Sequence, residues 1–165
     1  MLLRRGPTRL SNRDWECISI MRDIKRIFVH CTASSQSTTI KALQLEFKRK
    51  GWRNPGYHYV VDADGKITQL LDDSKISNGV QGWNSNAINV AYIGGIDAAN
   101  HATDNRTPAQ KSSLVSLLKL LIKRYPDATI MGHRDIWGAE SPGKWKKMCP
   151  CFNASAEYKE LCNGK

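Results

Sequence analysis

The stretch from Gly132 to Phe152 determines how the whole chain is interpreted. It begins Gly132-His133-Arg134-Asp135 and ends Lys147-Met148-Cys149-Pro150-Cys151-Phe152. A histidine and a cysteine therefore lie at the two ends of one loop, with a lysine two residues before the cysteine. Imidazole nitrogen and thiolate sulfur are side-chain ligands that zinc prefers. Because one histidine and one cysteine do not complete a zinc site, a further ligand must come from another part of the chain.

Two predicted strands end in histidine and offer that ligand. Arg26–Cys31 is apolar and β-branched and carries His30 near its end, and Ala128–Met131 leads directly to His133. If these strands are neighbours in a sheet, both imidazoles emerge at the same edge and Cys149 can fold back to them. Two histidines and one cysteine leave a fourth position open, which distinguishes a catalytic zinc from a structural one. Taken alone, each histidine also fits an ordinary hydrogen-bonded core residue.

The remaining metal-binding residue types are weaker candidates. A similar ligand set with an axial methionine is typical of copper electron-transfer sites. Met148 directly precedes Cys149, however, and adjacent side chains rarely converge on one metal, so zinc is favoured. His101 lies in a polar loop. On the predicted strand Gly56–Val61, Tyr57 and Tyr59 should share one face and His58 the other.

Hydrolysis at a zinc centre also needs polar groups that move a proton and stabilise the oxyanion. Tyr57 and Lys147 are the candidates, because Cys149, two residues after Lys147, would carry this lysine close to the metal. Each has a plainer interpretation: Tyr57 could simply pack across the sheet, and Lys147 could be a solvated surface charge.

The alternation of predicted elements indicates an α/β fold with a central mixed β-sheet flanked by helices. Helices are expected at Ser37–Lys50, at Thr107–Tyr125 and, briefly, at Ser155–Leu161. Thr107-Pro108-Ala109-Gln110 forms a capping box with proline at the first helical position, and Gly51 is expected to follow the C-terminus of the first helix. Besides the strands above, the expected strands are Lys66–Leu70, which returns from Gly56–Val61 as a hairpin, and Ile88–Ile93.

The 165 residues suggest one catalytic domain at 25–165, preceded by a basic extension at 1–24 in which Ile18-Ser19-Ile20 could form an edge strand. The net charge of +10 fits nucleic acid, an anionic membrane surface, an acidic cell wall or merely a solvated basic surface. The basic residues show no repeated aromatic interleaving, so no specific nucleic-acid partner is expected.

Neither signal-dependent secretion nor disulfide bonding is expected, so the chain stays in the cytoplasm or leaves it by a route that needs no signal. No apolar run approaches a transmembrane span, and the first residues lack the apolar core of a secretory signal. The cysteines number five, an odd count, which favours metal binding or free thiols over a disulfide framework. Apart from Cys149, the default expectation for Cys31, Cys151 and Cys162 is a buried, unpaired thiol.

These pieces together resemble the zinc-dependent N-acetylmuramoyl-L-alanine amidases of the amidase-2 group, which includes phage lysozymes with amidase activity and the peptidoglycan recognition proteins. The resemblance covers about residues 25 to 155. It rests on segments that occur in the family's order: Ile27-Phe28-Val29-His30-Cys31, Gly51-Trp52, Gly56-Tyr57-His58-Tyr59, Asp64-Gly65, Gly82-Trp83-Asn84, Ile93-Gly94-Gly95-Ile96-Asp97, Thr107-Pro108-Ala109-Gln110, Gly132-His133-Arg134-Asp135 and Lys147-Met148-Cys149-Pro150-Cys151-Phe152.

The resemblance implies His30, His133 and Cys149 as zinc ligands, at one edge of the sheet on the floor of a surface groove. It implies Tyr57 and Lys147 as the residues that assist hydrolysis of the amide between N-acetylmuramic acid and L-alanine in peptidoglycan. A phage or prophage endolysin is then expected, monomeric and cytoplasmic until lysis, when it acts on the cell wall. The alternative is a recognition module that binds peptidoglycan without cutting it, although such proteins usually lack the cysteine ligand.

One loop departs from the family pattern, and one segment between the candidate ligands has no assigned role. Many relatives carry a histidine that lines the substrate groove, in the loop that here reads Ile76-Ser77-Asn78-Gly79-Val80-Gln81, so groove contacts should differ. The segment Trp137–Trp145 contains two glycines and a proline, which suggests a mobile flap over the groove.

Overall fold

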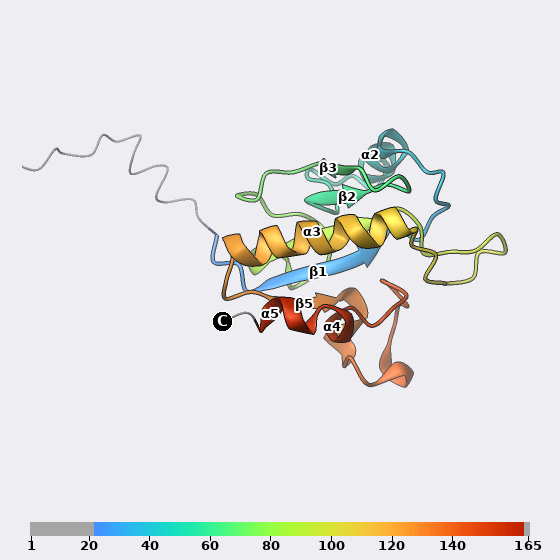
Figure 1. The fold of residues 1–165 in the computed structure, drawn as a ribbon. Coiled ribbons are helices and arrows are strands. Elements are labelled where there is room, and N and C mark those ends of the chain that lie inside the picture. Colours follow the sequence, from blue (N-terminus) through green and yellow to red (C-terminus); the bar gives the residue numbers. More distant parts are fainter. Residues whose placement is uncertain (1–21, 164–165) are drawn as a thin grey trace, which may run out of the picture.

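The strand β1 (Arg26–Cys31) pairs in parallel with β4 (Ala87–Tyr92) on one side and with β5 (Thr129–Gly132) on the other. The computed structural model describes residues 22–163, and within them the sheet has five strands in the order β3-β2-β4-β1-β5 (Figure 1). Strand β2 (Tyr59–Val61) is parallel to β4, and β3 (Ile67–Gln69) returns antiparallel to it at the edge. The expected α/β fold with a mixed sheet is confirmed.

The helices follow local sequence signals. Helix α3 (Pro108–Arg124) begins at the Thr107 cap, where the capping box with Gln110 is formed as expected. Helix α2 (Ile40–Arg49) is capped by Thr39, and Gly51 follows it at φ +72°, a value at which a side chain would be strained. The shorter helices are η1 (Asn84–Asn86), η2 (His133–Trp137), η3 (Pro142–Lys144), α4 (Ala154–Glu157) and α5 (Lys159–Cys162). The single closing helix expected at Ser155–Leu161 is thus two short helices.

The two faces of the sheet are covered by different elements. Helix α3 lies across one face, and α4 and α5 pack beside β5 (Figure 1). Leu114, Leu118 and Leu121 of α3 are fully buried there. Helix α2 and the loop before β4 cover the opposite face with two smaller apolar clusters. Since side chains alternate along β1, Val29 faces α3 and His30 faces the other way.

One expectation about β2 is wrong. Tyr57 and Tyr59 do not share a face, because the strand begins only at Tyr59 and the backbone before it is irregular. Tyr59 packs in the cluster under α3, whereas Tyr57 packs with Val60 on the α2 side. The irregular backbone therefore turns Tyr57 toward the face that carries His30.

The residues at the start of the described region already belong to the packed body. Ile24 is 4% exposed and lies in the main core. The guanidinium of Arg22 donates to the backbone carbonyls of Asn84 and Ala87 at 2.6 and 2.8 Å. The strand expected at Ile18–Ile20 lies outside the described residues. No helix between residues 22 and 163 is both long and apolar enough to cross a bilayer.

Candidate active site

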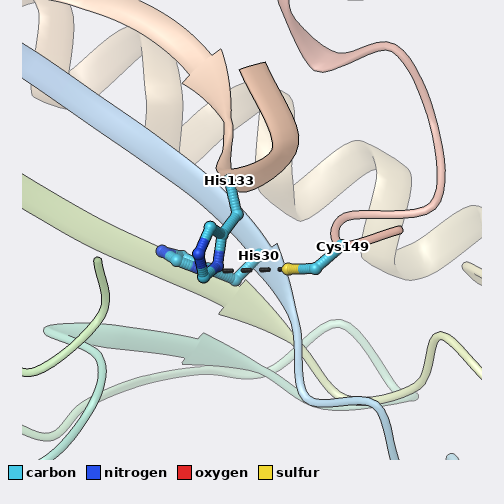
Figure 2. Close-up of side chains that lie close together, drawn as sticks. All are labelled: His30, His133 and Cys149. Atoms are coloured by element: carbon cyan, nitrogen blue, oxygen red, sulfur yellow. Dashed lines mark hydrogen bonds between the residues drawn. The ribbon is translucent and has the colours of Figure 1, made fainter. Parts of the chain in front are cut away.

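His30 and His133 meet because their strands are neighbours. In the parallel pair β1 and β5, Val29 lies opposite Gly132. The residue that follows each of these two is a histidine. Figure 2 shows the two imidazole rings side by side, with the sulfur of Cys149 next to them. The ring centroids of the histidines are 4.9 Å apart. The expected convergence of two strand ends is confirmed.

Several contacts bring the loop of Cys149 back to these strand ends. The backbone N–H of Arg134 donates to the carbonyl oxygen of Cys149 at 3.0 Å. The Tyr92 hydroxyl donates to the carbonyl oxygen of Pro150 at 2.7 Å. A β-carbon at Gly132 would lie 2.8 Å from Cδ of Pro150, so a glycine is needed where the loop crosses β5.

Three potential metal-binding atoms face one another at this point. Nδ1 of His30 lies 3.2 Å from Nδ1 of His133 and 3.7 Å from Sγ of Cys149. His30, His133 and Cys149 can each offer one ligand atom, and these atoms all lie within 4.8 Å of one another. The backbone N–H of Cys31 donates to Sγ of Cys149 at 3.3 Å and so helps to hold this sulfur in place.

Both imidazoles are held neutral. His30 is 1% exposed and His133 8%. Burial lowers the pKa of His30 to about 4, although its hydrogen bond with Asn89 opposes that shift. Burial, the neighbouring His30 and the charge of Lys147 together lower the pKa of His133 to about 3. A neutral imidazole is the form that binds a metal, so neither ring needs to lose a proton near pH 7.

The three residues lie in a cavity of about 300 Å³. Its walls come from the end of β1, from α2 and from the loop before β4. Besides the three candidate ligands, its lining includes Tyr57, Lys147, Glu46, Trp52, Asn78 and Gly79. The cavity therefore combines a possible metal centre with polar groups and an exposed aromatic ring.

Tyr57 and Lys147 are both placed at the cavity. The Tyr57 ring centroid lies 5.2 Å from that of His30, and its hydroxyl points to the carbonyl oxygen of Cys31 at 3.5 Å. Burial and the nearby Cys149 raise the pKa of Tyr57 well above its ordinary value, so its hydroxyl stays protonated. Lys147 is exposed, and its positive charge lowers the pKa of both histidines, so it acts electrostatically on the site.

The other candidates lie away from the cavity, as expected. His58 is buried in a structural network, where Nδ1 accepts from the backbone N–H of Asn89 at 3.0 Å. The side chain of His101 is 78% exposed and pairs with Asp97. Met148 is 48% exposed and does not line the cavity.

The thiols outside the candidate ligand set differ from one another. Cys31 is buried as expected, whereas Cys151 and Cys162 are half-buried. Sγ of Cys31 lies 3.8 Å from Sγ of Cys151, so these two thiols are direct neighbours.

The segment Trp137–Trp145 is attached to η2 at its far end. The indole N–H of Trp145 donates to the carbonyl oxygen of Gly138 at 2.7 Å, and the guanidinium of Arg134 lies 3.8 Å from the centroid of the Trp145 ring. These contacts count against a freely mobile flap.

Sequence reasoning missed Asn89. This residue is fully buried in β4, and its side-chain oxygen lies 2.7 Å from Nε2 of His30. Its amide nitrogen donates to Ser77 and Asn84. The available signal was an amide side chain within the otherwise apolar run Ile88-Asn89-Val90-Ala91, since a buried amide requires partners.

Known proteins are similar to this chain in sequence and in fold. The profile of the family Amidase_2, described as N-acetylmuramoyl-L-alanine amidase, matches residues 21–151. The endolysin of Klebsiella phage KP32 is 34% identical over 134 residues, which are 80% of this chain and 83% of that protein. The endolysin of Escherichia phage T7 is 35% identical over 129 residues, which are 77% of this chain and 80% of that protein.

Structural comparison gives the same fold. The endolysin N-acetylmuramoyl-L-alanine amidase LysCS from Clostridium intestinale superposes with a TM-score of 0.70 at 24% identity, covering 87% of this chain and 86% of that one. The family profile matches most of the chain, and the two phage proteins are 34% and 35% identical to it. The chain belongs to the N-acetylmuramoyl-L-alanine amidase family.

Proposed function

We propose that this chain cleaves the amide bond between N-acetylmuramic acid and L-alanine in peptidoglycan, using a zinc ion held by His30, His133 and Cys149. The observation that carries the proposal is the convergence of three ligand atoms within 4.8 Å in a cavity of about 300 Å³. Membership of the amidase family supports the reaction.

The donor set fits zinc. Two neutral imidazoles and one cysteine sulfur are borderline-soft ligands of the kind zinc prefers, and all three come from one chain. Because the protein supplies three ligands, a fourth coordination position is left for a water molecule or a substrate oxygen. Zinc rather than copper is favoured because Met148, the candidate axial ligand, lies outside the cavity.

A zinc ion bound there would supply a Lewis acid and lower the pKa of a bound water. The protein's own groups have separate tasks. The ammonium of Lys147 would lie beside the substrate carbonyl and stabilise the negative charge that develops on its oxygen. The Tyr57 hydroxyl stays protonated, so it would donate a hydrogen bond to the same oxygen or to the attacking water rather than act as a base.

The biological role we infer is that of an endolysin, acting as a monomer on the cell wall at the end of a phage infection. This inference rests on 34–35% identity to proteins named endolysins, of which the match covers 80–83%. The net charge of +10 suits binding to an acidic wall.

Digestion of purified peptidoglycan tests the activity. The zinc-loaded protein should release new N-terminal alanine without new reducing sugar ends. Cys149→Ser should lose stoichiometric zinc and this activity together, whereas Cys162→Ser, which removes a thiol outside the cavity, should keep both. Wall binding without any new alanine termini would contradict the proposal and favour the recognition module.

A further inference from the structure

Asn89 lies at the middle of β4 with no exposed surface, and its amide faces the candidate metal centre from behind His30. Its contact with Nε2 of His30, at 2.7 Å, is on the far side of the ring from Nδ1. Asn89 does not line the cavity, so it does not meet the substrate. Its position allows it to act on the reaction only through His30.

The orientation of the Asn89 amide is fixed by a chain of hydrogen bonds that begins at the backbone. The N–H of Val80 can only donate, and it lies 2.8 Å from the side-chain oxygen of Asn84. That oxygen is therefore an acceptor, and the Asn89 atom 3.1 Å from it must be the amide nitrogen. The same nitrogen donates to the Ser77 hydroxyl at 2.8 Å.

The consequence reaches the imidazole of His30. With both amide hydrogens of Asn89 engaged, its oxygen faces Nε2 of His30 and can only accept. Nε2 must then carry the ring hydrogen, and Nδ1 keeps its lone pair. Nδ1 is the atom that faces His133 and Cys149. The opposite tautomer would set two acceptors against each other inside the protein, an unfavourable arrangement for buried groups.

The loop before β4 is shaped to admit this amide. A β-carbon at Gly79 would lie 2.3 Å from Cγ and from the side-chain oxygen of Asn89. Because of this clash, a residue with a side chain at Gly79 would displace the amide that supports His30. The position of the Asn89 amide therefore requires a glycine at 79.

We propose that Asn89 is a positioning residue of the metal centre: held by Ser77 and Asn84, it fixes His30 as the Nε2–H tautomer and so presents Nδ1 to the metal. This proposal rests on the zinc centre proposed above. Hydrogen-bond partners behind a metal-bound histidine set its tautomer and orientation, and their loss lowers metal affinity by about 10- to 100-fold.

Asn89→Leu separates this role from simple packing, because it keeps the approximate size but removes the acceptor. The matched control is Asn86→Leu, which removes a nearby amide that pairs with Arg26 instead of a histidine.

The first measurement is nitrogen NMR of the ring couplings in the metal-free protein at pH 7, which reports the tautomer. The second is zinc affinity, by competition with a chelator. Wild type and Asn86→Leu should show His30 as Nε2–H and bind zinc equally. Asn89→Leu should show a tautomer mixture and about 10- to 100-fold weaker zinc binding.

The outcomes that would overturn the proposal are distinct from failure of the zinc centre itself. An Nδ1–H tautomer of His30 in the wild type overturns it, even if Asn89→Leu does not fold. Unchanged tautomer and zinc affinity in Asn89→Leu overturn it too, as does weaker zinc binding with the His30 tautomer unchanged, which would indicate packing alone. Absence of stoichiometric zinc in the wild type refutes the metal centre, while the tautomer still reports on Asn89.

Discussion

His30 should make the stability of the metal-free protein depend on pH. The ordinary pKa of histidine, 6.5, describes the unfolded chain, and burial lowers the pKa of His30 to about 4 in the folded protein. Between these values the unfolded chain binds more protons than the folded one, so stability rises with pH. The contribution of His30 is complete above pH 6.5 and is lost as the pH falls toward 4.

The size of the effect follows from the two pKa values. Each pH unit between them contributes about 1.4 kcal/mol. The full contribution of His30 is then about 3 kcal/mol, of which about 2 kcal/mol is lost between pH 7 and pH 5. His133, also buried with a lowered pKa, acts with the same sign.

Urea unfolding with a chelator present, repeated at pH 7, 6 and 5, measures this loss. His30→Gln should lose about 2 kcal/mol less than the wild type over that range, because glutamine takes up no proton and can still donate to Asn89. His101→Gln alters a histidine whose side chain is 78% exposed, and it should keep the wild-type dependence. Equal pH dependence in His30→Gln and the wild type would refute the idea that the folded protein holds His30 neutral.

Three further substitutions test the groove and its supporting loop. Lys147→Met should lower kcat about 10²-fold at unchanged zinc content, whereas Lys146→Met, the same change at the preceding residue, which does not line the cavity, should not; equal effects would mean that only surface charge matters. Tyr57→Phe should also lower kcat about 10²-fold without loss of zinc, and wild-type kcat would exclude its hydroxyl from the reaction. Gly79→Ala should destabilise the fold by about 1–3 kcal/mol in urea unfolding, because its β-carbon would lie 2.3 Å from a buried amide. Gly143→Ala, where nothing lies within 4 Å, is the control, and equal stability of both variants would contradict the close packing.

Much of the scaffold was predictable because its signals are local. The capping box at Thr107 and Gln110 depends only on residues a few positions apart, and it is found as expected. The sequence did not predict that β1 pairs with β5; it predicted only that a shared site would form if these strands were neighbours. Two strands that end in histidine are useful together only if they are neighbours, and the fold makes them so.

Other features depended on contacts between distant segments. Tyr57 and Tyr59 appeared to share a face because alternation assumes a regular strand, but β2 begins only at Tyr59. The side-by-side thiols of Cys31 and Cys151, at 3.8 Å, come from segments that only the folded chain brings together.

The sequence by itself determined the chemical inventory of this protein: two histidines at strand ends, a cysteine after a lysine, and the helices and strands that carry them. Only the tertiary structure decided how that inventory is oriented. A histidine has two ring nitrogens, and the one that faces the metal centre depends on the partner behind the other. That partner is the Asn89 amide on a neighbouring strand, itself oriented by the backbone N–H of Val80 through Asn84. Sequence spacing does not encode such a relay, because each of its hydrogen bonds exists only when the sheet and the loop before β4 have packed together.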